Sequence, residues 1–120
     1  MYNEEYLRNN GVDMDKALEL LEDMEMYNET IHDFYDKLDD VFTKLENYKD
    51  SGNVEDYVIE VHALKSDCKY LGFTPLANLA YNHELKGKEN DLDFINNNFA
   101  SLVEEKNKLV EIIKPYVENN

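Results

Sequence analysis

The chain contains few residues that break or cross-link a fold. Its 120 residues include one cysteine, two prolines and four glycines. A single cysteine cannot form a disulfide within the chain, and Cys68 falls on the apolar side of a helical pattern. We therefore interpret it as a small packing residue in a reducing compartment. Scarce proline and glycine, and the lack of runs that alternate apolar and polar residues, favour helices over sheets.

Long apolar stretches and basic charge are also scarce. No apolar run approaches the roughly 20 residues of a membrane span, and no charged start precedes an apolar stretch, so we expect neither a span nor a secretory signal. Acidic residues outnumber basic ones by 27 to 12, which gives a formal net charge of -15. Nucleic acids and anionic lipids attract basic surfaces, so this charge argues against both as partners. We expect a cytoplasmic protein, and the acidic surface favours a monomer.

Apolar residues recur at helical spacing along most of the chain. Residues 1–10 form either a short docking helix or a frayed end, and Asp13 can cap a short helix over 14–21. Four longer patterns follow: Met26 or Tyr27 to Tyr48, 54–71, 74–87, and Asn90 or Asp91 to near Pro115. Their short connections predict an all-α fold, an antiparallel four-helix bundle with one or two short extra helices at the N-terminus. The length fits a single domain over residues 1–120.

Capping residues mark the ends of the two middle helices. Asn53 can cap the helix over 54–71, and Gly72 can end it in the left-handed conformation. The hydroxyl of Thr74 can cap the next helix, where Pro75 fits the first turn.

His62 lies at the edge of the apolar stripe of the helix over 54–71, beside Val61. Lys65, Ser66 and Lys69 follow it by three, four and seven residues and therefore share its side of the helix. We expect an exposed imidazole with two ammonium groups nearby. Between residues 60 and 90 four basic residues balance four acidic ones, so this segment is positive relative to the rest of the chain. Such a segment suits a site that accepts a phosphoryl group.

His62, Leu64, Lys65, the small residue Ser66 and Gly72 together form a pattern that resembles the signature of histidine-containing phosphotransfer (HPt) domains of bacterial two-component phosphorelays. The resemblance continues through the apolar positions of the following helix and covers about residues 11–114. Ser66 departs from the family pattern, because most members have glycine there.

The resemblance implies that His62 accepts a phosphoryl group from an aspartyl phosphate on a receiver domain and passes it to another receiver. Lys65 would bind the phosphate oxygens. Magnesium would come from the carboxylates of the receiver, and this chain would hold no cofactor or metal. No glycine-rich phosphate loop is present, so we expect a phosphotransfer intermediate and not an enzyme with its own nucleotide site.

The expected partners are response-regulator receiver domains and also a hybrid histidine kinase. Apolar residues beside a reactive ring are typical of a transient protein interface. One alternative is a helical module that binds a receiver or kinase without accepting phosphate, and another is a structural bundle with no partner. The exposed rim around His62 is predicted to include Ile59, Ala63, Ser66, Lys69 and, on the next helix, Glu84 and Lys88.

The other two histidines point to no metal or protease site. A di-iron bundle needs the Glu-x-x-His step twice, and only Glu29 and His32 provide it. His83 and Glu84 begin a zinc-protease pattern that Gly87 fails to complete. We interpret His83 as a partly buried packing residue and His32 as a surface residue.

Overall fold

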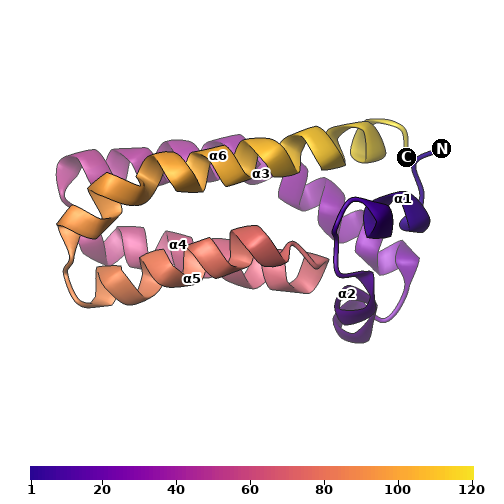
Figure 1. Ribbon diagram of the computed structural model, residues 1–120, viewed down its shortest axis with the longest axis horizontal. Helices are drawn as coiled ribbons and strands as arrows, with labels where there is room; N and C mark the ends of the chain where they lie inside the picture. The colour runs from indigo at the N-terminus through magenta and orange to yellow at the C-terminus, as the bar shows by residue number, and fades with distance from the viewer.

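The computed structural model describes all residues from 1 to 120 and contains six helices and no strand. The four long helices α3 to α6 form an antiparallel bundle, and the short helices α1 and α2 lie at one end of it (Figure 1). The predicted fold class is confirmed. The helices are α1 (Glu4–Asn9), α2 (Met14–Leu21), α3 (Met24–Ser51), α4 (Val54–Leu71), α5 (Thr74–Lys88) and α6 (Leu92–Glu118).

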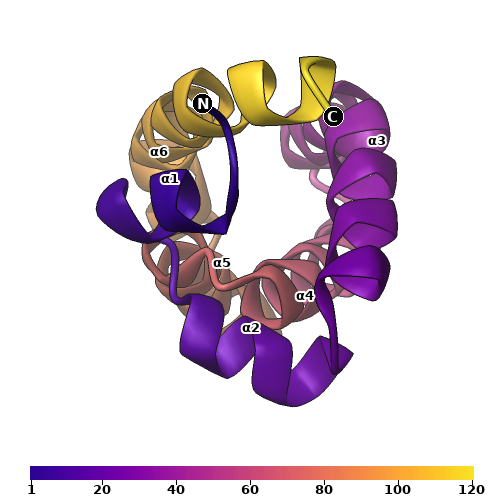
Figure 2. The same cartoon turned by 90° about the vertical axis from the view of Figure 1, so that its right-hand side faces the viewer.

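Each bundle helix packs on two neighbours, because α3 contacts α4 and α6, and α5 contacts the same two helices. The end view in Figure 2 shows these helices around a common centre, and α2 packs against α4 and α3 at one end. Residues 1–10 are docked and not frayed, since Leu7 of α1 is fully buried. The last helix extends past Pro115, its expected end, and continues to Glu118.

Several helix ends follow the predicted capping chemistry. Asp13 accepts a hydrogen bond from the backbone N–H of Lys16, and Asn53 accepts one from that of Asp56. Asp91 caps α6 in the same way. These side chains satisfy backbone donors that the first turn of a helix leaves free.

The expected Thr74 cap is wrong. Phe73 occupies the capping position without a side-chain hydrogen bond, and Thr74 is already helical. The Phe73 backbone N–H instead donates to the Cys68 carbonyl at 2.8 Å, which closes the end of α4. Gly72 is left-handed, with a φ of 82°, and Phe73 alone separates it from Thr74, the first residue of α5.

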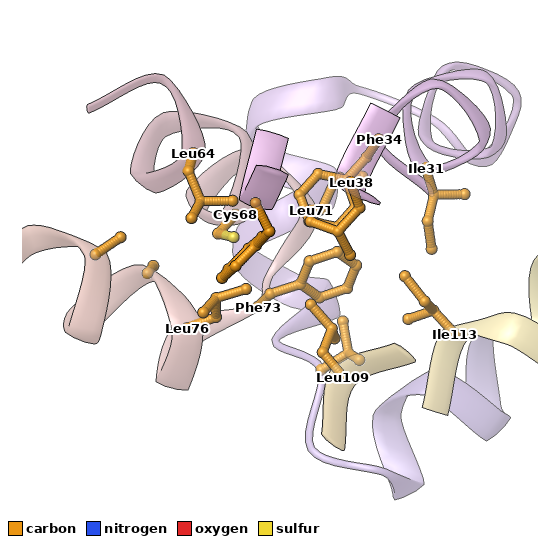
Figure 3. Packing of buried hydrophobic residues seen from close by; sticks show 14 of the residues in the cluster. Ile31, Phe34, Leu38, Leu64, Cys68, Leu71, Phe73, Leu76, Leu109 and Ile113 are labelled. Atoms are coloured by element: carbon orange, nitrogen blue, oxygen red, sulfur yellow. The ribbon is translucent and has the colours of Figure 1, made fainter. Parts of the chain in front are cut away.

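Apolar side chains from all four bundle helices meet in one core (Figure 3). Cys68 lies in this core with no exposed surface, and burial raises the pKa of its thiol. The predicted packing position of Cys68 is therefore confirmed. None of the helices has a segment whose length and apolar character would let it cross a bilayer.

Gly87 brings α4 and α5 close together. A Cβ atom at this buried position would lie 2.5 Å from Val58 Cγ2, so even the smallest side chain here would force Val58 or the helices to shift. This close approach matters for the site below, because residues of α5 next to Gly87 come into contact with the exposed edge of α4.

Candidate functional site

His62 lies on α4 with its side chain 55% exposed, as predicted. Its neighbour Val61 is fully buried and fixes which side of the helix faces the core. The imidazole also has one specific contact with α5, because its Nδ1 atom lies 2.7 Å from Oε2 of Glu84. The Nε2 atom makes no hydrogen bond within the protein.

Glu84 is the residue whose position differs most from the sequence expectation. We predicted it on the exposed rim, and this is wrong, since its side chain is only 3% exposed. The close approach of α4 and α5 at Gly87 places this carboxylate in the seam between the helices. Nitrogen-bearing side chains from both helices cover it. They are His62, Lys65 at 2.6 Å and Lys88 at 3.2 Å.

These contacts keep Glu84 ionised. Burial on its own would raise the pKa of the carboxyl group, but hydrogen bonds from Lys65, His62 and Lys88 outweigh it and lower the pKa to about 2. Burying a charge is costly unless opposite charges and hydrogen bonds compensate it, and here two ammonium groups do so.

The charge of Glu84 determines the tautomer of His62. An ionised carboxylate only accepts hydrogen bonds, so the imidazole nitrogen that faces it must carry the proton. Nδ1 is therefore the donor, and the lone pair of the neutral ring lies on Nε2. The site thus combines a half-exposed imidazole, whose Nε2 lone pair has no partner within the protein, with a buried carboxylate bound to its Nδ1.

The two lysines at Glu84 differ in solvent exposure and in their contacts. The Lys65 side chain is 12% exposed, and its ammonium also lies 5.1 Å from the centre of the Tyr81 ring. The Lys88 side chain is 59% exposed. Lys65 is therefore enclosed by its contacts, whereas most of the Lys88 side chain is accessible to solvent.

Not all of the predicted site residues gather at His62. Lys69 forms no ion pair, and it lines a groove of about 450 Å³ between α2, α4 and α5 together with Lys16. Ser66 is half-buried and lines the same groove. The two ammonium groups next to His62 are therefore Lys65 and Lys88, and not Lys65 and Lys69.

Apolar side chains are exposed on both helices around His62. Ile59 is 63% exposed and Ala63 is also exposed, as predicted. Sequence reasoning missed Tyr81 and Leu85 of α5, which are 47% and 39% exposed. Both are apolar or aromatic residues that lie off the inward stripe of their helix, and this signal was available in the sequence.

Comparison with known proteins finds no match. No protein-family model, no curated protein and no solved structure matches the chain.

The remaining histidines form hydrogen bonds with other partners than those of His62. His83 is 2% exposed, and its Nδ1 lies 2.9 Å from the hydroxyl of Tyr57, so the predicted packing role is confirmed with deeper burial than expected. Burial lowers the pKa of His83. His32 is half-buried, and its Nε2 lies 3.1 Å from the carbonyl of Asn120. Its expected surface position is only partly correct, because the C-terminus folds over it.

Proposed function

We propose that this protein is a phosphorelay intermediate, in which His62 accepts a phosphoryl group from a receiver-domain aspartate and passes it to another receiver. The observation that carries the proposal is the His62 side chain, which is 55% exposed, has no hydrogen bond at Nε2 and donates its Nδ1–H to the ionised carboxylate of Glu84. The resemblance of the residues around His62 to HPt domains supports the same function.

The chemistry needs no proton transfer at the reacting nitrogen. The Nε2 lone pair forms a bond to phosphorus while the bond between phosphorus and the aspartyl oxygen breaks, and the aspartate leaves as a carboxylate. The imidazole ring, still protonated at Nδ1, gains positive charge. Glu84 stabilises that charge through the hydrogen bond at 2.7 Å. In the second transfer the N–P bond breaks, its electron pair returns to Nε2, and the next aspartate takes the phosphoryl group.

The lysines supply charge for the transferred group. Lys65, Lys88 and Glu84 together carry one net positive charge beside a neutral His62. A histidine-bound phosphoryl group carries a charge of about -2, so it competes with Glu84 for both ammonium groups. Phosphoryl transfer depends mainly on positioning and on such charge neutralisation. We expect the exposed Lys88 to move to the phosphate first, and Lys65 then to bind it in exchange for Glu84.

The partner surface consists of the apolar side chains around His62. Ile59 and Ala63 on α4, and Tyr81 and Leu85 on α5, flank the ring on the two helices. A transient interface needs such apolar contacts near its centre. We propose that receiver domains, in the cytoplasm, dock here and supply the magnesium ion, and that a hybrid histidine kinase is one source of the phosphoryl group.

The test is labelling of the pure protein by a phosphorylated receiver domain in the presence of magnesium. We expect an acid-labile phosphoryl group on His62, which is absent from His62→Gln and unchanged in the control His32→Gln. Label that persists in His62→Gln would refute the assignment. If the receiver binds but no label appears in either protein, the chain is a binding module that accepts no phosphate.

A further inference from the structure

Tyr81 lies on α5 one turn before Glu84, with its ring against the ammonium group of Lys65. The Nζ atom of Lys65 is 5.1 Å from the ring centre and 2.6 Å from Oε1 of Glu84. The ammonium thus has an anion and the face of an aromatic ring as its partners, and its side chain is 12% exposed. The Tyr81 hydroxyl makes no hydrogen bond within the protein.

Lys88 provides an internal comparison. It binds the same carboxylate, at 3.2 Å, but contacts no aromatic ring, and its side chain is 59% exposed. The carboxylate alone therefore leaves a lysine largely in solvent. The aromatic ring is one clear difference between the surroundings of Lys88 and Lys65, because a ring face attracts a cation and also covers the lysine stem.

We propose that Tyr81 is a positioning residue that holds the Lys65 ammonium beside His62, ready to bind the phosphoryl group when it reaches Nε2. The inference rests on the proposed function, since it concerns the same transfer. When the phosphoryl group arrives, the ammonium has to exchange Glu84 for phosphate oxygens. The Tyr81 ring keeps the Lys65 ammonium close to His62 during this exchange and prevents it from rotating into solvent.

The hydroxyl has no partner, so the proposal assigns the effect to the ring alone. Tyr81→Phe keeps the ring and should behave like the wild type. Tyr81→Leu keeps an apolar side chain for a docking partner but removes the negative face of the ring. The two variants therefore separate an effect on Lys65 from an effect on an apolar contact.

The experiment uses phosphoramidate as a small phosphoryl donor, so that no partner has to dock. The Nε2 lone pair bonds to phosphorus, the P–N bond of phosphoramidate breaks, and ammonia leaves. We expect Tyr81→Leu to slow the labelling of His62 by about two- to five-fold, the range that a cation–π contact at an exposed site implies. Tyr81→Phe should match the wild type, and so should Tyr70→Leu, a change at an equally exposed tyrosine outside the site.

A double-mutant cycle and an NMR measurement complete the test. In a Lys65→Ala background, Tyr81→Leu should cause no further loss, because the ring then has no ammonium to hold. The side-chain methylene protons of Lys65 should show a ring-current shift in the wild type and in Tyr81→Phe, which Tyr81→Leu abolishes.

The inference is overturned if Tyr81→Leu labels at the wild-type rate, or if its effect persists in full without Lys65. Failure of the proposed function looks different. In that case the wild type takes no phosphoryl group at His62 from a receiver domain or from phosphoramidate, while the ring-current shift of Lys65 remains. Tyr81 would then still contact Lys65 but would have no role in phosphoryl transfer.

Discussion

Replacing Glu84 by glutamine should destabilise the protein, and by an amount that depends on pH. The carboxyl pKa falls from an ordinary value of 4.5 to about 2 in the folded protein. At about 1.36 kcal/mol per pKa unit, this corresponds to an upper bound of about 3 kcal/mol. The side chains of His62 and Lys88 are more than half exposed, so water screens their share. We expect a loss of about 1–2 kcal/mol at pH 7.

The sign of the pH dependence follows from the lowered pKa. A carboxyl group that ionises more easily in the folded state stabilises the protein at pH values above its unfolded pKa, and this contribution is lost as the pH falls towards the folded pKa. The difference between wild type and Glu84→Gln should therefore be constant near neutral pH. It should shrink progressively between pH 4.5 and about 2, where the wild-type carboxyl group also becomes neutral.

The assay is urea unfolding of both proteins at several pH values from 7 downwards. Glu89→Gln is the matched control, because Glu89 is exposed and its partner Lys86 lies 4.0 Å away, so its loss should cost little. If Glu84→Gln is as stable as the wild type at pH 7, the cations do not hold the carboxylate as described. A difference that stays the same down to pH 3 would equally refute the reasoning, because it would come from packing and not from charge.

Two further predictions concern the bundle. Burial lowers the pKa of His83, so the unfolded chain takes up a proton below about pH 6.5 that the folded protein excludes. The free energy of unfolding should therefore fall as the pH drops below that value, and His83→Gln should weaken this dependence in acid titrations of stability. Gly72 and Gly52 both have positive φ, but only at Gly72 would a Cβ atom collide with the backbone of Asp13. Thermal unfolding should show a loss of about 1–2 kcal/mol for Gly52→Ala and a larger one for Gly72→Ala.

The sequence predicts features that depend on neighbours along the chain. The spacing of apolar residues locates the helices, and Asp13 and Asn53 are recognisable caps because each acts on a backbone group three residues away. The exposure of His62 follows from its place beside the apolar stripe. The burial of Glu84 does not follow, because it depends on how closely α5 approaches α4 at Gly87. The Thr74 cap failed because α5 begins one residue earlier than expected, with Phe73 at the capping position and Thr74 already in the helix.

Glu84 has two opposing effects on the proposed transfer. It stabilises the positive charge that His62 gains, but it also binds the two ammonium groups that the phosphoryl group needs. A neutral residue in its place would free Lys65 and Lys88 and would lose control of the His62 tautomer. The two lysines differ in solvent exposure, and this difference reconciles the two effects. Lys88 is largely in solvent and can leave, whereas Lys65 keeps the buried carboxylate paired until the phosphoryl group arrives. The site can therefore remain electrostatically satisfied both before and after transfer.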